Sequence, residues 1–202
     1  MLYVALGALG FLVALLFDHP RIEKTRWAKL TIGVVAFSAL GYAVGAAAAH
    51  PSRFTFPSAV AGVGWALAGI FLILFIYSVF IEIPFRQAYL GAQNGTGLVD
   101  TGTYAMSRHP GVLWAALALV FLVVATGSKI LLIATPLWIL MDLAWAYIED
   151  RFYFPTSFPG YGDYQNEVPM FIPTASSLRR AARTIRGPRR GINPEGSNGR
   201  DA

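Results

Sequence analysis

The sequence predicts an all-α integral membrane protein with five transmembrane helices, and three observations lead to this prediction. Of the 202 residues, 55% are hydrophobic and only 13% are charged, and the mean hydropathy is +0.53, which is unlike a water-soluble globular protein. Five apolar stretches have about the length that a helix needs to cross a bilayer. The Lys and Arg residues are concentrated in alternate connections between those stretches.

The five predicted spans are residues 2–17, 30–49, 58–83, 111–127 and 130–148. The first is short, like a signal peptide, but it lacks a basic start and a small-residue cleavage site, so we expect a retained helix. The first and second spans are rich in Ala and Gly, which is typical of helices that pack closely in lipid. Only Ser128 and Lys129 separate the fourth span from the fifth, which predicts a tight antiparallel hairpin. This hairpin would bring His109 and Pro110 beside Glu149 and Asp150.

The distribution of basic residues predicts the orientation of the chain. Fourteen of the 16 Lys and Arg residues lie in the first connection, the third connection and the C-terminal tail. By the positive-inside rule the N-terminus is outside and the C-terminus is cytoplasmic. We therefore expect a multi-pass protein of the inner or plasma membrane. It has one transmembrane domain over 1–173, whose cofactor half is about 84–173.

Residues 174–202 are predicted to form a basic, largely disordered cytoplasmic tail. Such a tail fits anionic lipid headgroups better than nucleic acid. The chain contains no cysteine, which excludes disulfides, thiolate nucleophiles and cysteine metal sites. With three scattered histidines, we expect no metal site.

Polar residues of the second half indicate a ligand site. The connection 84–110 is longer than a plain link needs, and its polar side chains are those of a ligand-contacting surface; they include Arg86, Gln87, Tyr89, Asn94 and Tyr104. On the fifth span, Trp138, Asp142, Trp145 and Glu149 share one helical face. Asp142 lies roughly 10 Å along the helix from Glu149. At that depth an acid is either a functional group or a structural Asp bonded to a neighbour, and the sequence leaves both open.

The fourth span begins at a short polar segment, Ser107 to Pro110. Proline fits the first turn of a helix, and Ser107 or His109 is placed to cap it. A helix N-terminus beside Arg108 suits an anionic ligand group. The alternative is that Arg108 and His109 are ordinary interfacial anchors.

Three segments together show a resemblance to a known family. They are "LVDTGTYAMSRHP" (98–110), "IEDRF" (148–152) and "FPGYGDYQNEVPMFIP" (158–173). In this order and spacing the chain resembles the isoprenylcysteine carboxyl methyltransferase family. The wider group includes phospholipid methyltransferases and is related in its C-terminal half to membrane sterol reductases. The resemblance covers about residues 98–173.

The resemblance implies an integral membrane methyltransferase that uses S-adenosylmethionine on a lipid or small lipophilic acceptor at the cytoplasmic face. By position, the implied cofactor-binding residues are Tyr104, Arg108, His109, Pro110, Glu149, Asp150, Tyr161 and Tyr164, with Pro173 in the closing segment. Glu149 and Asp142 are the candidate catalytic residues, as bases for an amine or hydroxyl acceptor.

Two alternatives remain open. The family motif continues with Tyr and Gly where this chain has Val112 and Trp114, which favours a non-catalytic member that binds a lipid or a partner. A reductase that uses NADPH shares the Arg-His-Pro segment and a Tyr- and Pro-rich ending. The paired acids after the last helix favour the methyltransferase over the reductase.

Overall fold

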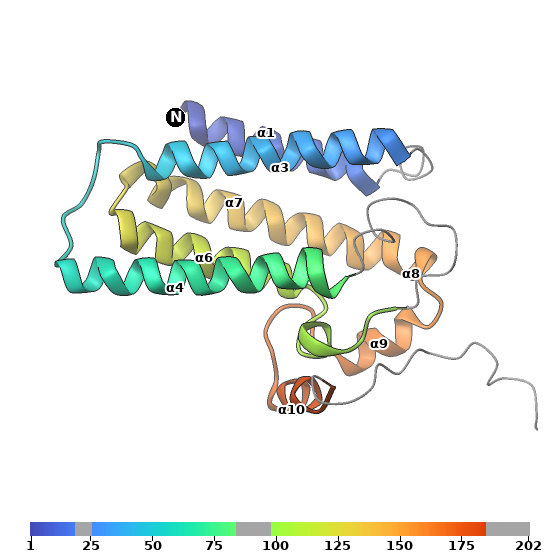
Figure 1. The fold of residues 1–202 in the computed structure, drawn as a ribbon. Helices are drawn as coiled ribbons and strands as arrows, with labels where there is room; N and C mark the ends of the chain where they lie inside the picture. The colour runs from blue at the N-terminus through green and yellow to red at the C-terminus, as the bar shows by residue number, and fades with distance from the viewer. Residues whose placement is uncertain (19–25, 84–97, 185–202) are drawn as a thin grey trace, which may run out of the picture.

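The computed structural model describes residues 1–18, 26–83 and 98–184, and within these ranges all regular elements are helical. This confirms the predicted all-α fold. Five long helices run side by side as a bundle: α1 (Leu2–Ala14), α3 (Arg26–Ala48), α4 (Ser58–Ile76), α6 (Pro110–Thr126) and α7 (Lys129–Ile148) (Figure 1). The shorter elements are η1 (Leu15–Asp18), η2 (Tyr77–Glu82), η3 (Gly102–Ala105), η4 (Glu149–Tyr153), α8 (Phe154–Ser157), α9 (Tyr161–Glu167) and α10 (Ala175–Thr184).

Three helical segments in the described part of the chain are long and apolar enough to cross a membrane. They are Trp27–Ala48, Ser58–Glu82 and Lys129–Ser157, and they indicate a membrane protein. The second and third are lengthened by the π-helical turns η2 and η4, which continue α4 and α7. The apolar helices α1 and α6 are shorter, with 13 and 17 residues.

The predicted hairpin is present between α6 and α7. Gly127 ends α6 in the left-handed conformation, with φ of +63°, and a Cβ there would overlap the carbonyl oxygen of Phe54. Ser128 caps α7 by accepting a hydrogen bond from the Leu131 amide at 3.2 Å, and its hydroxyl donates to the Ala47 carbonyl at 2.6 Å. The α6–α7 turn therefore packs against the 49–57 connection, at what we call the loop end of the bundle.

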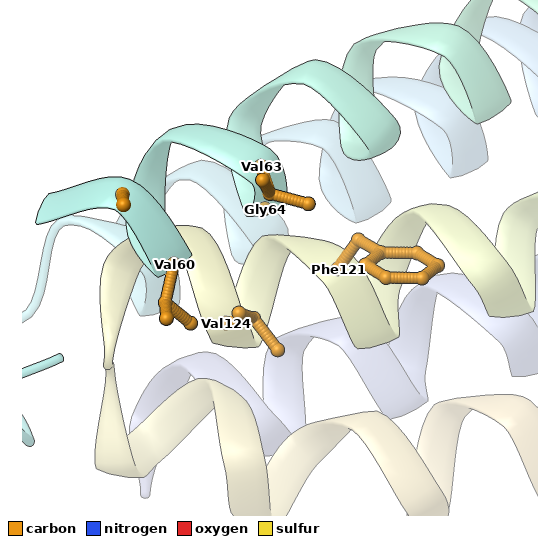
Figure 2. Close-up of a pocket in the computed structure, with 6 residues that line it drawn as sticks. Val60, Val63, Gly64, Phe121 and Val124 are labelled. Carbon is orange, nitrogen blue, oxygen red and sulfur yellow. The ribbon is translucent and has the colours of Figure 1, made fainter. Parts of the chain in front are cut away.

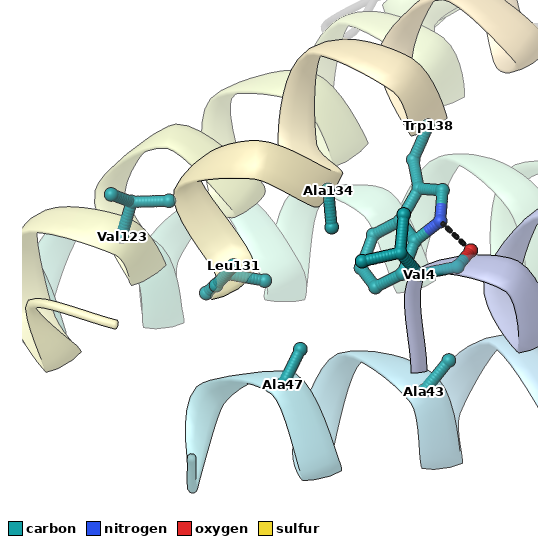
Figure 3. Close-up of a cluster of buried hydrophobic side chains, with 7 residues drawn as sticks. All are labelled: Val4, Ala43, Ala47, Val123, Leu131, Ala134 and Trp138. Atoms are coloured by element: carbon teal, nitrogen blue, oxygen red, sulfur yellow. Dashed lines mark hydrogen bonds between the residues drawn. The ribbon is translucent and has the colours of Figure 1, made fainter. Parts of the chain in front are cut away.

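The main hydrophobic core joins α1, α3, α6 and α7 (Figure 3). Its buried members are Val4, Ala43, Ala47, Val123, Leu131, Ala134 and Trp138. Trp138 is 1% exposed, and its indole N–H donates to the Val4 carbonyl at 3.2 Å. The alanines let the helices approach closely, and the single indole fills the space that remains. These contacts hold the short helix α1 against α7.

Helices α4 and α6 pack closely at Gly64, where an added Cβ would lie 2.6 Å from the Ala125 nitrogen. Beside this contact lies a hollow of about 290 Å³ (Figure 2). Its lining residues are Ala59, Val60, Val63, Gly64, Phe121 and Val124. The hollow lies near the loop end. Its lining is apolar, so it offers no polar or charged side chain for catalysis.

The opposite end of the bundle carries α8, α9 and α10 (Figure 1), and we call it the α9 end. There Tyr161, Tyr164 and Val168 form a second buried cluster, against which Phe154 and Phe158 pack. The segment predicted to be a largely disordered tail from residue 174 begins with an ordered helix, α10, because Ser177 and Ala181 bury one of its faces. The rest of the predicted tail, from 185, lies outside the described residues.

Candidate functional site

A cavity of about 730 Å³ runs through the bundle and is lined by side chains of α1, α3, α4, α6 and α7. This volume is in the range of ligand pockets. Its walls are mostly apolar. The polar and charged side chains that line it are Tyr104, Arg108, His109, Asp142 and Glu149, together with the indoles Trp65, Trp138 and Trp145.

The side chain of Arg108 is held in place by protein groups. Its Nε and Nη2 atoms donate to the two carboxylate oxygens of Asp150 at 2.8 and 3.1 Å. Its Nη1 atom donates to the carbonyl oxygens of Gln165 and Val168 at 2.8 and 2.7 Å. The side chains of Arg108 and Asp150 are 11% and 9% exposed. Arg108 therefore joins the start of α6 to η4 and to the end of α9, as a two-pronged guanidinium–carboxylate pair.

Asp150 also accepts hydrogen bonds from two residues of α9. The Tyr161 hydroxyl donates to its Oδ1 at 2.6 Å, and the Gln165 amide donates to its Oδ2 at 3.0 Å. Burial, and then the hydrogen bond to Asp150, raises the pKa of Tyr161. Burial also raises the pKa of Tyr164, whose hydroxyl donates to the Tyr104 carbonyl at 2.7 Å. Both phenols thus remain neutral donors that fasten α9 to the bundle.

The backbone around Arg108 is bonded to the segment that follows α9. The Arg108 and His109 amides donate to the carbonyls of Pro169 and Met170 at 2.9 and 3.1 Å. The Ser107 hydroxyl donates to the same Met170 carbonyl at 2.9 Å. Residues 107–109 are therefore fixed before α6 begins, and His109 has little freedom to move.

His109 lies between the two acids that follow α7. Its Nδ1 atom is 3.9 Å from Glu149 Oε2, and its Nε2 atom is 3.6 Å from Asp150 Oδ1. The imidazole is 7% exposed and stacks on the Phe154 ring with centroids 5.7 Å apart. Nε2 is buried and has no hydrogen-bond partner in the described part of the chain. The ring therefore lies beside both acids with its Nε2 atom buried and not hydrogen-bonded.

The paired acids have different positions. Asp150 is buried and pairs with Arg108, whereas Glu149 lines the cavity. Both belong to the π-helical turn η4, which changes the direction of successive side chains relative to an α-helix. Glu149 therefore faces the cavity, whereas Asp150 belongs to the bonds that join α6, η4 and α9.

The predicted face of the last long helix is confirmed. Trp138, Asp142, Trp145 and Glu149 all line the cavity. The carboxyl group of Asp142 has no hydrogen bond or ion pair with any residue that the structure describes. The structural alternative for Asp142, a bond to a neighbouring hydroxyl or backbone group, is thus not observed among these residues.

Glu82 supports the site without lining the cavity, and its role was not predicted from the sequence. It is 8% exposed, and it accepts a hydrogen bond from the Thr103 amide at 2.8 Å and another from the Thr103 hydroxyl. Gly102 has a φ of +60°, and a Cβ there would overlap the Glu82 carboxylate. Glu82 thus positions the η3 turn, which contains Tyr104. An acid four residues after Ser78, at the end of a span, was the available signal.

The other predicted residues have mixed outcomes. Pro110 occupies the first turn of α6 and is buried, as expected. His109 stands at the N-cap position but makes no side-chain cap bond, so the prediction that its side chain caps the helix is wrong. The Ser107 hydroxyl accepts a hydrogen bond from the His109 amide at 3.3 Å and also donates to the Met170 carbonyl, so it satisfies the N-cap residue rather than the first turn. The predicted contacts of Arg86, Gln87, Tyr89 and Asn94 lie outside the described residues.

No family model, no curated protein and no solved structure matches this chain. The chemistry of the site must therefore be inferred from its geometry. A buried imidazole and a carboxylate stand at the α9 end of a long apolar cavity, and a second carboxylate stands farther along it. Such a cavity can hold a charged group at the α9 end and a hydrocarbon body along its apolar walls.

Proposed function

We propose that this protein is a membrane methyltransferase that uses S-adenosylmethionine to methylate a lipid or small lipophilic acceptor. The observation that supports the proposal is the cavity of about 730 Å³, which connects His109 and Glu149 to apolar walls within the membrane-crossing helices. A methyl transfer between a polar cofactor and a lipophilic acceptor needs such a two-part chamber. The resemblance of residues 98–173 to isoprenylcysteine carboxyl methyltransferases supports the same reaction.

The residues at the α9 end fit the charges of this cofactor. Its ammonium and sulfonium groups are cationic, and the cavity wall at this end carries the carboxylate of Glu149, while the cation Arg108 is neutralised by Asp150. Glu149, His109 and Tyr104 would hold the cationic and hydroxyl groups. The first-turn amides of α6 have no helical acceptor, and Gly111 and Val112 of that turn line the cavity. They would receive the carboxylate, because the donors of Arg108 are already used.

The cofactor supplies an activated methyl group, and the protein supplies position and dryness. An in-line displacement at carbon needs little acid or base, so orientation and the exclusion of water dominate. Arg108, Asp150 and Tyr161 act as positioning residues, since they fix the start of α6 against η4 and α9. Phe154 and Phe171 flank His109 and shield it from water.

The acceptor would reach the cavity from the membrane, between α3 and α4. Both helices line the cavity. Three of their lining residues, Gly41 on α3 and Trp65 and Leu72 on α4, are also exposed on the surface of the protein. Lining residues that are exposed on the surface indicate an opening of the cavity. This opening lies on membrane-crossing helices, where the surrounding solvent is hydrocarbon.

We further propose five membrane spans, with the N-terminus outside and the α9 end in the cytoplasm. The distribution of Lys and Arg supports this orientation. Because the chain has no cysteine, single cysteines report topology without background. In intact cells a membrane-impermeant maleimide should label Ser52→Cys and not Asp163→Cys, and permeabilisation should expose the second. Labelling of Asp163→Cys in intact cells would reverse the orientation.

Calorimetry on the purified protein tests the function. We expect saturable binding of S-adenosylmethionine and S-adenosylhomocysteine, and no binding of NADPH. Glu149→Gln should weaken the affinity about tenfold or more, as expected for the loss of a charged hydrogen bond. Asp163→Asn makes the same chemical change at an exposed position of α9 and should leave the affinity unchanged. No binding of either adenosyl compound would refute the methyltransferase.

One observation favours a second candidate function, a non-catalytic lipid-binding protein. Arg108 and Asp150 satisfy each other and the α9 segment, so two residues that the resemblance assigns to the cofactor already have a structural use. The same cavity would then bind a lipophilic molecule alone. Lipid binding together with the absence of adenosyl-compound binding would identify this function.

A further inference from the structure

Asp142 is an acidic side chain within a membrane-crossing segment, and its carboxyl group has no partner among the described residues. It belongs to the candidate span Lys129–Ser157 and lines the cavity. A carboxyl group at such a position is costly unless a partner satisfies it. Its placement on the cavity wall, rather than against a neighbouring helix, indicates that the partner is a ligand.

The cavity wall itself offers Asp142 no free cation. Arg108 is the only Lys or Arg among the described lining residues, and its guanidinium is bonded to Asp150 and to two carbonyl oxygens. His109 stands beside Glu149 and Asp150, one end of the predicted cofactor site. Asp142 lies about 10 Å farther along the same helix, seven residues before Glu149. A ligand that reaches Asp142 must therefore bring its own positive charge.

The surroundings of Asp142 fit an organic cation better than a metal ion. Two indole rings of the same helix, Trp138 and Trp145, line the cavity on either side of it in the sequence. The indole N–H of Trp138 is donated to the Val4 carbonyl, so this ring is fixed and offers no donor to Asp142. Within the described residues there is no group of His, Cys, Asp and Glu that could hold a metal ion. A carboxylate in an apolar cavity, with an indole residue about one helical turn away on each side, suits an ammonium group.

We propose that Asp142 binds the amine of the lipophilic acceptor, so that the nucleophile of the reaction is an amine nitrogen. The inference rests on the proposed function and names its substrate class. A protonated amine has no free electron pair. When it is paired with Asp142, one proton passes from nitrogen to a carboxylate oxygen, which leaves a neutral amine with its lone pair free and a neutral carboxylic acid. A neutral hydroxyl or thiol acceptor would gain no charge pairing with Asp142. An anionic carboxylate or phosphate acceptor would be repelled by it.

Photolabelling of the full-length protein in nanodiscs tests this inference without cofactor. The probes are two alkyl diazirines of equal chain length, one ending in a primary amine and the other in an alcohol. Labelled peptides are mapped by mass spectrometry. We expect the amine probe to label residues of α7 around Asp142 about tenfold more than the alcohol probe, which is the preference expected for a charge-assisted contact. Equal labelling by the two probes would overturn the inference.

Matched variants assign the preference to the carboxylate. Asp142→Asn should abolish the amine preference, Asp142→Glu should retain it, and Asp163→Asn should have no effect, because Asp163 is exposed on α9. If Asp142→Asn does not fold, the Glu variant and the two-probe comparison still decide the question. An amine preference that persists in a folded Asn variant would refute the role of Asp142.

The two proposals fail separately. Binding of S-adenosylmethionine without an amine preference would keep the methyltransferase and exclude an amine acceptor. An amine preference that depends on Asp142, without binding of any adenosyl compound, would keep the amine site. It would then belong to a non-catalytic lipid-binding protein.

Discussion

Arg108 and Asp150 are 42 residues apart in the sequence, and they form a two-pronged ion pair at the α9 end, with N–O distances of 2.8 and 3.1 Å. Each partner also bonds to α9, Arg108 through two carbonyl oxygens and Asp150 through Tyr161 and Gln165. The pair therefore joins the start of α6, the end of α7 and α9. Its removal should affect the folded state before it affects any ligand.

Asp150→Asn should destabilise the protein strongly. Breaking a buried ion pair leaves an unpaired charge, here the Arg108 guanidinium, and costs about 3 kcal/mol or more. We expect a clear fall of the unfolding temperature in detergent, measured by Trp fluorescence. Arg151→Gln changes an exposed neighbour and should leave the unfolding temperature within about 1 °C. An Asn variant as stable as the wild type would show that the pair does not hold this end together.

Tyr161→Phe should have a smaller effect on the same pair. It deletes only the hydroxyl that donates to Asp150 at 2.6 Å, while Arg108 and Gln165 still satisfy the carboxylate. We expect a loss of about 1 to 2 kcal/mol. The measurement is the unfolding temperature under the conditions used for Asp150→Asn. A loss as large as that of the Asn variant would mean that the phenol, rather than the guanidinium, is the dominant partner.

A comparison of Gly102→Ala with Gly160→Ala separates a steric effect from a backbone effect. Both glycines have a positive φ. An added Cβ would overlap the Glu82 carboxylate at Gly102, whereas at Gly160 it would meet nothing within 4 Å. Gly160→Ala should therefore cost only the left-handed backbone, about 1 kcal/mol. Gly102→Ala should cost more, because Glu82 must also release Thr103.

Hydrogen exchange provides the second readout for this pair of variants. Gly102→Ala should increase exchange in η3 and in α10, because the Gly102 amide donates to the Thr184 hydroxyl at 3.0 Å. Gly160→Ala should leave both segments unchanged. Equal effects of the two variants would remove the proposed role of Glu82 in positioning η3.

The local patterns of the sequence predicted the long helices and the hairpin, because these depend on apolar runs and on a two-residue turn. The hairpin also predicted that His109 and Glu149 are neighbours, and their side chains lie 3.9 Å apart. The sequence did not distinguish Glu149 from Asp150. That difference depends on a π-helical turn, which has no strong residue signature, and on the position of α9, which is set by long-range contacts.

The same reasoning explains why Glu82 was missed and why α10 was not predicted. Glu82 is identified only by its bonds to Thr103, 21 residues later in the sequence. Helix α10 has an arginine-rich composition that is typical of a solvated tail. Its order depends on Ala181, which packs with Ala105 and Met106, and on Arg180, which pairs with Asp100 at 3.0 Å and with Glu167.

Gly7→Ala should loosen α1. A Cβ at Gly7 would overlap the buried indole of Trp138, so the helix must move away or the ring must shift. Overpacking of this kind costs about 1 to 3 kcal/mol. The control is Gly62→Ala, where the new Cβ meets nothing within 4 Å and the helix should be unchanged or slightly stabilised. A fall of the unfolding temperature for both variants would mean that the effect is not specific to the Trp138 contact.

Helix α10 should bind anionic headgroups through Arg179 and Arg183. Both side chains are exposed, whereas Arg180 is held by Asp100 and Glu167. Burial alone would lower the pKa of Arg180, but the hydrogen bond to Glu167 raises it. In nanodiscs, replacing zwitterionic lipid with anionic lipid should increase the exchange protection of α10. The double variant Arg179→Gln/Arg183→Gln should lose this gain, at about 1 kcal/mol per arginine.

The effect of anionic lipid on α10 should also weaken at high salt, because exposed charges are screened. Ser176→Ala, an exposed change on the same helix, is the control and should keep the full gain. Protection that does not depend on lipid charge in the wild-type protein would contradict headgroup binding by α10.

Filling the cavity at its glycines should block the lipophilic ligand and spare the cofactor site. Gly41 and Gly69 line the cavity, and a Cβ at either would meet nothing within 4 Å, so Gly41→Leu and Gly69→Leu should fold and project into the open space. The new side chains should occupy the space of the alkyl chain, so photolabelling by the alkyl amine should fall several-fold. Gly69 is 13 residues, or about 20 Å, from Glu82 at the α9 end of α4 and η2. Calorimetric affinity for S-adenosylmethionine should therefore stay unchanged. Gly62→Leu, which has equal space but lies outside the cavity, should alter neither measurement. If all three variants label like the wild type, the acceptor does not occupy this part of the cavity.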